Sequence, residues 1–301
     1  TRLAADFASL AAEATVRRFG DTMRLRLLVP LTILLLAPEV LAVRAIPDDN
    51  LAYPVLIALQ PSGTGSGFFI NRADGIYLVT ARHVLFTDTL GLRGPRAELT
   101  AYSKNPDEVV RNIITLDLAV LQKTGDLRAH PSRDVAVVRI ASVTPDQPQK
   151  PLQVLPGVSV VSHSASGILG AGPDTIRKYE QVLVANEVLV FGYPTSLGLR
   201  QVPQLDLSRP LLRRGIVAGL NPSLRSIVLD CPVYPGNSGG PVLQIDTEGL
   251  ERHFRIIGVV SQFVPFVETW VNATHGYENA SIGNSGYSIV TPMDYVLELV
   301  H

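Results

Sequence analysis

The chain has 301 residues, of which 46% are hydrophobic, so it can bury a large core and is not a disordered protein. Its 26 Lys and Arg residues nearly balance 27 acidic residues, and the net charge of -1 gives no electrostatic reason to expect nucleic acid as a partner. The single cysteine, Cys231, excludes an intrachain disulfide and any zinc site built from several thiolates.

The first 45 residues are expected to form an N-terminal extension with a signal peptide or anchor. Two positive charges, at Arg24 and Arg26, precede an apolar run over residues 27–38, and small residues follow at Ala42 and Ala45. That order is typical of a secretory signal peptide, and the run is shorter than the ~20 residues needed to span a bilayer. We therefore expect an exported protein, whether secreted, periplasmic or part of the cell envelope. A membrane is an expected partner only if the segment remains as an uncleaved anchor.

From residue 46 onward, short stretches of alternating apolar and polar residues are separated by clusters of Gly, Pro, Asn and Asp, which predicts an all-β fold. Candidate strands cover residues 53–59, 67–70, 76–80, 97–102, 134–140, 187–191, 226–229, 241–244 and 254–260. A short helix over residues 295–300 is predicted to close the chain, because Thr291 and Pro292 supply an N-terminal hydroxyl and a helix-starting proline.

A segment rich in Pro, Gly, Ser and Gln divides these strands into two groups. We expect an N-terminal β-barrel over residues 46–145, a connection over 146–185, and a C-terminal β-barrel with the closing helix over 186–301. Strands curled into barrels leave no long exposed sheet edge.

Ser238 lies in the sequence Gly236-Asn237-Ser238-Gly239-Gly240. Glycines on both sides allow a tight turn that exposes the serine oxygen and directs backbone N–H groups to one point, as an acyl-transfer nucleophile requires. A glycine-rich turn without chemistry is the alternative for such a motif taken alone. The Gly-x-Ser-x-Gly pattern of α/β-hydrolases also fits, but that fold needs a helix after the serine and a later histidine, whereas another predicted strand follows here.

His83 ends an apolar strand and is the candidate base for this serine, although a histidine in such a position can also be a packed core residue. A catalytic base needs a carboxylate that holds the imidazole in one tautomer. Two residues have the required local pattern, because both Asp117 and Asp134 precede an apolar stretch. The residues by themselves leave these two acids open.

Taken together, the segments resemble the trypsin-like serine peptidases of the chymotrypsin fold, and within them the bacterial type related to the HtrA and glutamyl endopeptidase branches. The similar segments are Gly65-Ser66-Gly67-Phe68, Thr80-Ala81-Arg82-His83-Val84, Asp134-Val135-Ala136-Val137 and Gly236-Asn237-Ser238-Gly239-Gly240-Pro241. The resemblance covers about residues 50–300, the catalytic domain only. It implies two six-stranded antiparallel β-barrels and a short C-terminal helix.

The resemblance implies that Ser238 is the nucleophile, His83 the general base and Asp134, rather than Asp117, the orienting carboxylate. It places the oxyanion hole at Gly236, Asn237 and Ser238. The implied activity is that of a serine endopeptidase that hydrolyses polypeptides through an acyl-enzyme, without a cofactor or metal. The alternative is a catalytically silent binding or scaffold protein that keeps the same fold.

The resemblance also places substrate contacts. Ser261 is expected in the cleft, where the substrate backbone pairs as an added strand. Pro232 and Val233 are expected at the base of the pocket for the P1 side chain. Because neither is acidic, we expect a small or apolar P1 residue rather than Arg or Lys, although Asp230 lies nearby in the sequence. Cys231 is expected to be a buried structural thiol.

Overall fold

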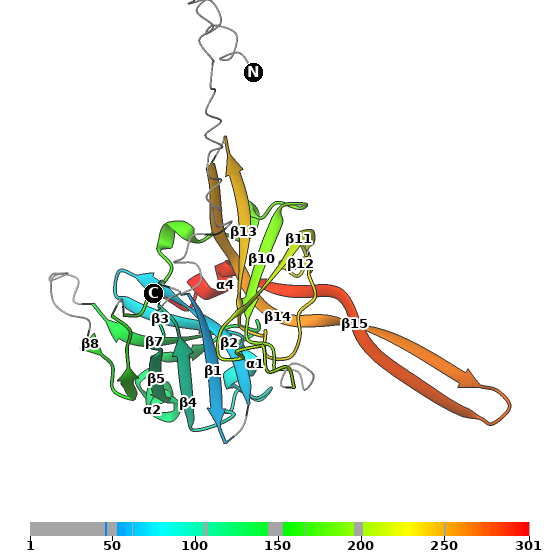
Figure 1. The fold of residues 1–301 in the computed structure, drawn as a ribbon, viewed down its shortest axis with the longest axis horizontal. Helices are drawn as coiled ribbons and strands as arrows, with labels where there is room; N and C mark the ends of the chain where they lie inside the picture. The colour runs from blue at the N-terminus through cyan, green and yellow to red at the C-terminus, as the bar shows by residue number, and fades with distance from the viewer. Residues whose placement is uncertain are drawn as a thin grey trace, which may run out of the picture. The chain divides into compact units, whose positions relative to one another are not determined.

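The computed structural model describes residue 46 and residues 53–61, 63–103, 105, 108–143, 153–165, 167–195, 201–249 and 251–300, all within one compact unit (Figure 1). The predicted signal peptide or anchor, residues 1–45, lies outside the described residues. In the part of the chain that is described, no helix is both long enough and apolar enough to cross a bilayer.

The N-terminal lobe is an antiparallel sheet of nine described strands. The path runs β6-β7-β3-β2-β1-β4-β5-β9, and β8 pairs with β7. The strands are β1 (Pro54–Gln60), β2 (Thr64–Arg72), β3 (Gly75–Thr80), β4 (Arg96–Ala101), β5 (Asn112–Asp117), β6 (Leu127–Ala129), β7 (Ala136–Ser142), β8 (Gln153–Val154) and β9 (Val158–Ser162).

The strand count of this lobe differs from the six that were predicted. Short strands are added around the central ones, and two of them, β8 and β9, lie in the predicted connection. The connection is therefore shorter than residues 146–185. The reason is that β9 lies at one end of the strand path and leaves most of its side chains exposed, so it lacks the apolar pattern of a core strand.

The C-terminal lobe is a closed six-stranded barrel, as predicted. Its strand order is β10-β11-β12-β15-β14-β13. The bounds are β10 (Glu187–Gly192), β11 (Leu211–Asn221), β12 (Ser226–Asp230), β13 (Pro241–Glu248), β14 (Glu251–Asn272) and β15 (Tyr277–Pro292). The all-β prediction is confirmed, because the described helices are short: α1 (Arg82–Leu85), α2 (Leu118–Thr124), α4 (Met293–Leu297) and the 3-10 turns Pro173–Thr175 and Tyr179–Gln181.

The two lobes share a hydrophobic core. Strand β3 is buried on both faces, so Leu78 packs inside the first sheet while Val79 faces the second lobe. There Val79 belongs to the same buried cluster as Phe191 of β10, Val259 of β14 and Met293 of α4. Residues of both lobes and of the closing helix are thus held against one another, which fixes the loops at the seam between the lobes.

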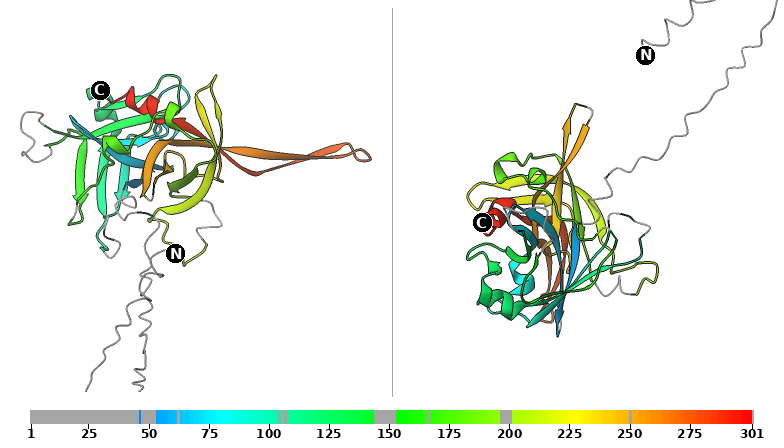
Figure 2. Two further views of the ribbon diagram at one scale, coloured as in Figure 1. Left: turned by 90° about the horizontal axis from the view of Figure 1, so that it is seen from above. Right: turned by 90° about the vertical axis from the view of Figure 1, so that its left-hand side faces the viewer.

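Strands β14 and β15 continue beyond the barrel as a two-stranded hairpin. Their pairing extends from Pro265 opposite Asn284 to Asn272 opposite Tyr277. We call residues 264–286 the arm; Figure 1 and the left view of Figure 2 show it extending away from the barrel. The predicted strand ends at residue 260, because apolar residues lie on both faces of the arm and hide the period of two.

Candidate active site

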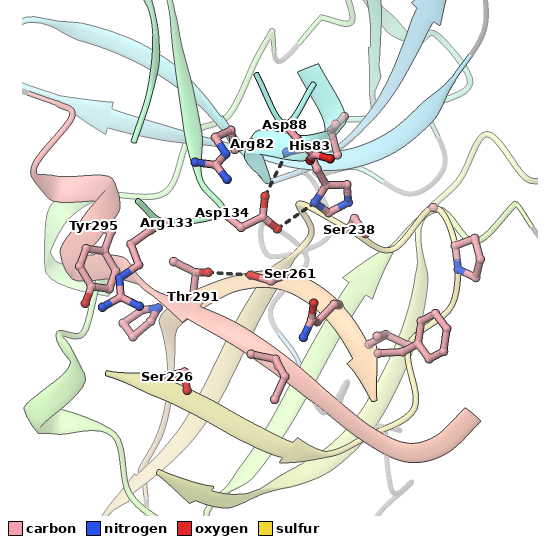
Figure 3. A pocket seen from close by; sticks show the side chains of 18 of the residues that line it. Arg82, His83, Asp88, Arg133, Asp134, Ser226, Ser238, Ser261, Thr291 and Tyr295 are labelled. Carbon is pink, nitrogen blue, oxygen red and sulfur yellow. Dashed lines mark hydrogen bonds and ion pairs between the residues drawn. The ribbon is translucent and has the colours of Figure 1, made fainter. Parts of the chain in front are cut away.

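A pocket of about 770 Å³ lies where the two lobes meet. Its walls include His83 from α1, Asp134 from the loop before β7, Ser238 from the loop before β13 and Ser261 from β14. Three predicted catalytic residues from distant parts of the sequence therefore line one pocket. Figure 3 shows the His83 ring lying between Asp134 and Ser238.

The carboxylate of Asp134 contacts His83 at two points. Its Oδ2 lies 2.8 Å from Nδ1 of the ring, and its Oδ1 accepts the backbone N–H of His83 at 3.0 Å. An ionised carboxylate can only accept hydrogen bonds, so the ring proton belongs on Nδ1. Nε2 is then left with its lone pair, as a general base requires.

The rival acid, Asp117, has a different structural role. Its Oδ1 accepts the backbone N–H of Val120 at 3.0 Å and caps the N-terminus of α2. Asp117 does not line the pocket. The structure thus brings Asp134, and not Asp117, to His83.

The turn that carries Ser238 is closed by Asn237, which is 1% exposed. The backbone N–H of Asn237 donates to the carbonyl of Tyr234 at 2.9 Å, and its side-chain Oδ1 accepts the N–H of Tyr234 at 3.1 Å. The prediction that Asn237 lies in the oxyanion hole is therefore wrong, because its N–H already has an acceptor within the turn. Its two hydrogen bonds to Tyr234 close the turn.

Two other N–H groups of this turn remain available. The carbonyl of Pro235 accepts the N–H of Thr195 at 2.9 Å. In a trans peptide the C=O and N–H groups point in opposite directions, so the N–H of Gly236 is directed away from Thr195. Within the described residues, neither this N–H nor that of Ser238 has an acceptor. Two unpaired donors on residues that line the pocket can stabilise an oxygen that gains negative charge.

Ser66, on β2, connects this turn to the N-terminal lobe. Its buried hydroxyl donates to the carbonyl of Gly236 at 2.6 Å and accepts the N–H of Tyr193 at 2.9 Å. Its own N–H donates to the carbonyl of Ser238 at 2.8 Å. At Gly239, where φ is +88°, a Cβ would lie 2.0 Å from the carbonyl oxygen of Ser66, so only glycine fits.

Ser66 is not among the site residues predicted from the sequence. The available signal was its position between Gly65 and Gly67, where a Cβ would collide with Val84 and with the carbonyl of Val79 respectively. Such crowding indicates that the strand is packed closely on both sides.

The loop that carries Asp134 is shaped by His130, which is also new to the site. Nδ1 of this buried ring accepts the backbone N–H groups of Arg133 at 3.0 Å and Ser132 at 3.3 Å, and its Nε2 lies 3.0 Å from a carboxylate oxygen of Glu298. Because Nδ1 accepts these hydrogen bonds, the ring proton lies on Nε2. Because Glu298 follows α4, this histidine links the Asp134 loop to the C-terminal end of the chain. The signal in the sequence was the His130-Pro131 pair before Asp134.

The cleft side of the pocket is formed by β14. Ser261 is buried and its hydroxyl lies 2.6 Å from that of Thr291, while Gln262 and Phe263 are exposed. Val233 and Ile289 line the pocket, whereas Pro232 does not. The exposed Asp230 is also outside its walls.

The charged residues in the pocket wall are mainly positive. Two acids, Asp88 and Asp134, are outnumbered by Arg82, Arg93, Arg133 and Arg225. Arg225 is already paired with Glu180 and Asp294. Apart from Arg225, three arginines and two carboxylates line the pocket.

Cys231 is fully buried, as predicted, and burial raises the pKa of its thiol to about 11. Over the part of the chain that the structure describes, no group of three or more His, Cys, Asp and Glu residues could hold a metal ion.

A sequence model of the family described as trypsin-like peptidase domain matches residues 65–250. No curated protein sequence matches the chain. Similar solved structures include an HtrA-type protease AlgW with tripeptide, at 17% sequence identity and a TM-score of 0.44. Another is Deg5, at 20% sequence identity and a TM-score of 0.46. These alignments cover 82% and 83% of this chain, and 58% and 88% of AlgW and Deg5 respectively.

Proposed function

The chain belongs to the trypsin-like peptidase domain family, and from this premise we propose that it is a serine endopeptidase that cleaves polypeptides through an acyl-enzyme intermediate. The observation that carries the proposal is the contact between Asp134 and His83 at 2.8 Å, which leaves Nε2 of the ring to act on Ser238. The pocket at this position is open enough, at about 770 Å³, to receive a peptide.

In the proposed first half-reaction, the oxygen of Ser238 attacks the scissile carbonyl carbon and its proton passes to Nε2 of His83. Asp134 stabilises the imidazolium that forms. The carbonyl oxygen becomes an anion that accepts hydrogen bonds from the N–H groups of Gly236 and Ser238, each worth about 3 kcal/mol of barrier lowering. The C–N bond then breaks as His83 returns the proton to the leaving amine.

The second half-reaction repeats these steps with water. His83 removes a proton from the water molecule, which attacks the acyl group on Ser238, and the same two N–H groups hold the oxyanion. Breakdown releases the new carboxyl terminus and restores the hydroxyl of Ser238.

For the P1 residue we propose a small or apolar side chain. Val233, Ile289 and Phe263 supply apolar walls, and the arginines of the pocket repel a cationic side chain. A peptide library that varies only P1 tests this: Ala, Val or Leu is expected to give the highest kcat/KM. Fastest cleavage after Arg or Lys contradicts the assignment.

We also propose that the protein is exported, on the basis of Arg24, Arg26 and the apolar run that follows. N-terminal sequencing of the protein recovered from a bacterial envelope or medium is expected to find a new terminus close to Ala45. Recovery of the uncleaved chain in the cytoplasm contradicts export.

Digestion of an unfolded protein substrate tests the endopeptidase activity itself. Wild-type protein is expected to produce internal fragments that mass spectrometry identifies, while Ser238→Ala produces none. A folded wild-type protein that leaves the substrate intact, or equal cleavage by the variant, contradicts the proposal and favours a binding protein with the same fold.

A further inference from the structure

The arm exposes apolar side chains on both of its faces. Residues that are directly opposite in an antiparallel pair share a face, as do residues two apart in one strand. Val267, Ile282 and Val271 therefore lie on one face, and Phe266 and Trp270 on the other. Val271 and Ile282 are each 71% exposed, and Trp270, the only tryptophan of the chain, is 51% exposed.

This exposure is large for a surface without a partner. Together with Tyr277, these side chains leave roughly 700 Å² of mainly apolar surface in water, divided between the two faces of the arm, and a single patch of a few hundred Å² is already large for a typical monomer. A two-stranded ribbon is at best marginally stable in water, and a third strand on its edge is one of the additions that stabilise it. The composition and geometry of the arm therefore favour a binding partner.

The distribution of apolar residues indicates what kind of partner fits. A flat partner, such as a membrane or the surface of a folded protein, covers only one face of a ribbon. A strand added at the edge places its alternating side chains beside both faces at once. The arm also contains Glu268 and Glu278 but no Lys or Arg, so it lacks the positive charge that attracts anionic lipids or nucleic acid.

The edge available for such a strand begins in the pocket. β14 pairs with β13 only as far as Val259, and among the described residues its outer edge has no strand partner from Ser261 onward. Ser261, Gln262 and Phe263 line the pocket, and the same strand continues into the arm as far as Asn272. A polypeptide that pairs with β14 beside Ser238 is therefore directed along the arm. From Pro265 to Asn272 the arm offers a length of about 26 Å, enough for ~8 extended residues.

One hydrogen bond attaches the base of the arm to the same site, and a second joins the two strands of the arm at its base. The side-chain N–H of Asn284 donates to the carbonyl of Val233 at 2.6 Å, and the hydroxyl of Ser285 donates to the carbonyl of Val264 at 2.7 Å. Val233 belongs to the wall of the pocket. The direction of the arm is thus tied to the walls that receive the substrate.

We propose, on the basis of the peptidase function proposed above, that the arm binds an extended apolar segment of the polypeptide substrate, remote from the scissile bond, as a third strand along β14. The preferred substrate class is an unfolded chain rich in β-branched and aromatic residues. A folded protein has free backbone groups only at its sheet edges, whereas an unfolded chain can present them along any extended segment.

Two variants separate the arm from the rest of the site. In the first, residues 267–282 are replaced by Asn-Gly, so that Phe266 and Gly283 are joined by a two-residue hairpin and both hydrogen bonds at the base remain. In the second, Val267→Thr, Val271→Thr and Ile282→Thr keep the β-branched shape and remove apolar surface. Labelling of Ser238 by a fluorophosphonate shows that each variant keeps a folded site.

The parent substrate is a short fluorogenic peptide. Test substrates lengthen it at the N-terminal or the C-terminal end by ~8 residues of alternating Val and Thr, and the matched controls carry alternating Gly and Ser instead. Wild-type protein is expected to cleave one of the Val/Thr peptides with kcat/KM about tenfold above that of its Gly/Ser control. With the arm shortened that ratio falls to about one, and in the threonine variant, which keeps Phe266 and Trp270, it falls to an intermediate value. Variants that keep the full preference overturn the inference while leaving the peptidase function in place.

Binding measured without turnover distinguishes the two proposals. With Ser238→Ala as background, fluorescence anisotropy is expected to give a Kd for the fluorescently labelled Val/Thr peptide about tenfold weaker once the arm is shortened. If this difference is found although wild-type protein hydrolyses no peptide, the arm inference stands and the peptidase function fails. If shortening the arm leaves the Kd unchanged but converts a dimer to a monomer in sedimentation, a second copy occupies the arm and the inference is wrong.

Discussion

The hydroxyl of Ser66 donates a 2.6 Å hydrogen bond to the carbonyl oxygen of Gly236 across the seam between the lobes. The N–H of Ser66 donates to the carbonyl of Ser238, and Thr80 on β3 donates its hydroxyl to the carbonyl of Ser66. One buried serine thus connects the lobe that carries His83 to the turn that carries the proposed nucleophile. The relative position of base and nucleophile depends on this residue, which takes no part in the proposed chemistry.

Removing that hydroxyl is expected to lower turnover more than substrate binding. Ser66→Ala leaves the buried carbonyl of Gly236 and the N–H of Tyr193 without partners, at a cost of about 1–3 kcal/mol. We expect kcat for a short peptide to fall about tenfold while KM stays within about twofold. Steady-state kinetics measure both values, and Ser159→Ala, an exposed serine on β9, is the control. An unchanged kcat contradicts the assigned role.

The two candidate acids can be separated by matched substitutions. Asp134→Asn keeps the size of the side chain but can donate to Nδ1 and so favours the wrong tautomer of His83, which is expected to reduce kcat about 10⁴-fold. Asp117→Asn is expected to leave kcat nearly unchanged, because asparagine also caps a helix well. A large loss of kcat with Asp117→Asn, and none with Asp134→Asn, reverses the assignment.

His130 is expected to act as a positioning residue for Asp134. His130→Ala removes the acceptor for two backbone N–H groups of the loop and is expected to lower kcat about tenfold or more, with KM little changed. His130→Asn places an oxygen near the position of Nδ1 and is expected to recover most of kcat. If His130→Ala acted only by leaving a cavity, His130→Asn would not restore kcat. Equal values of kcat and KM for the two variants therefore contradict the positioning role. Circular dichroism melting of both variants checks that they are folded.

The buried thiol of Cys231 leads to a prediction about pH. Burial raises its pKa to about 11, while an unfolded cysteine titrates near 8.5. The folded state therefore favours the neutral thiol, whose contribution to stability is present below about pH 8.5 and is lost as the pH rises toward 11. At pH 8 a thiol reagent is expected to react with native protein at least about 100-fold more slowly than with protein in denaturant. Equal rates contradict the burial.

Residues whose constraints are local could be predicted from the sequence. Gly236 and Gly239 have φ of +96° and +88°, a conformation of the turn itself that favours glycine, and the apolar run over residues 135–138 marks a strand that is buried in the structure as β7 (Ala136–Ser142). The C-terminal barrel was predicted for the same reason, since most of its strands present one apolar face to the interior. Asp134 was distinguished from Asp117 only by resemblance to a family, because both have the same local pattern.

Residues whose roles arise from distant contacts could not be predicted. Ser66 and Gly236 are 170 positions apart in the sequence, and His130 is 168 positions from Glu298. Strand β11 carries apolar residues at adjacent positions, Leu211 with Leu212 and Ile216 with Val217, and the arm is apolar on both faces, so neither has the sequence alternation that marks a strand with one side in water. The resemblance to the family places Asn237 in the oxyanion hole, whereas its N–H donates to the carbonyl of Tyr234 within the turn.

The central claim is that Ser238 is made reactive by His83, and a fluorophosphonate probe followed by mass spectrometry tests it most directly. Wild-type protein is predicted to carry a single adduct on Ser238; Ser238→Ala is predicted to carry none, and His83→Ala to react at least about 10³-fold more slowly. A folded wild-type protein that remains unlabelled, or that carries its adduct on another residue, contradicts the account.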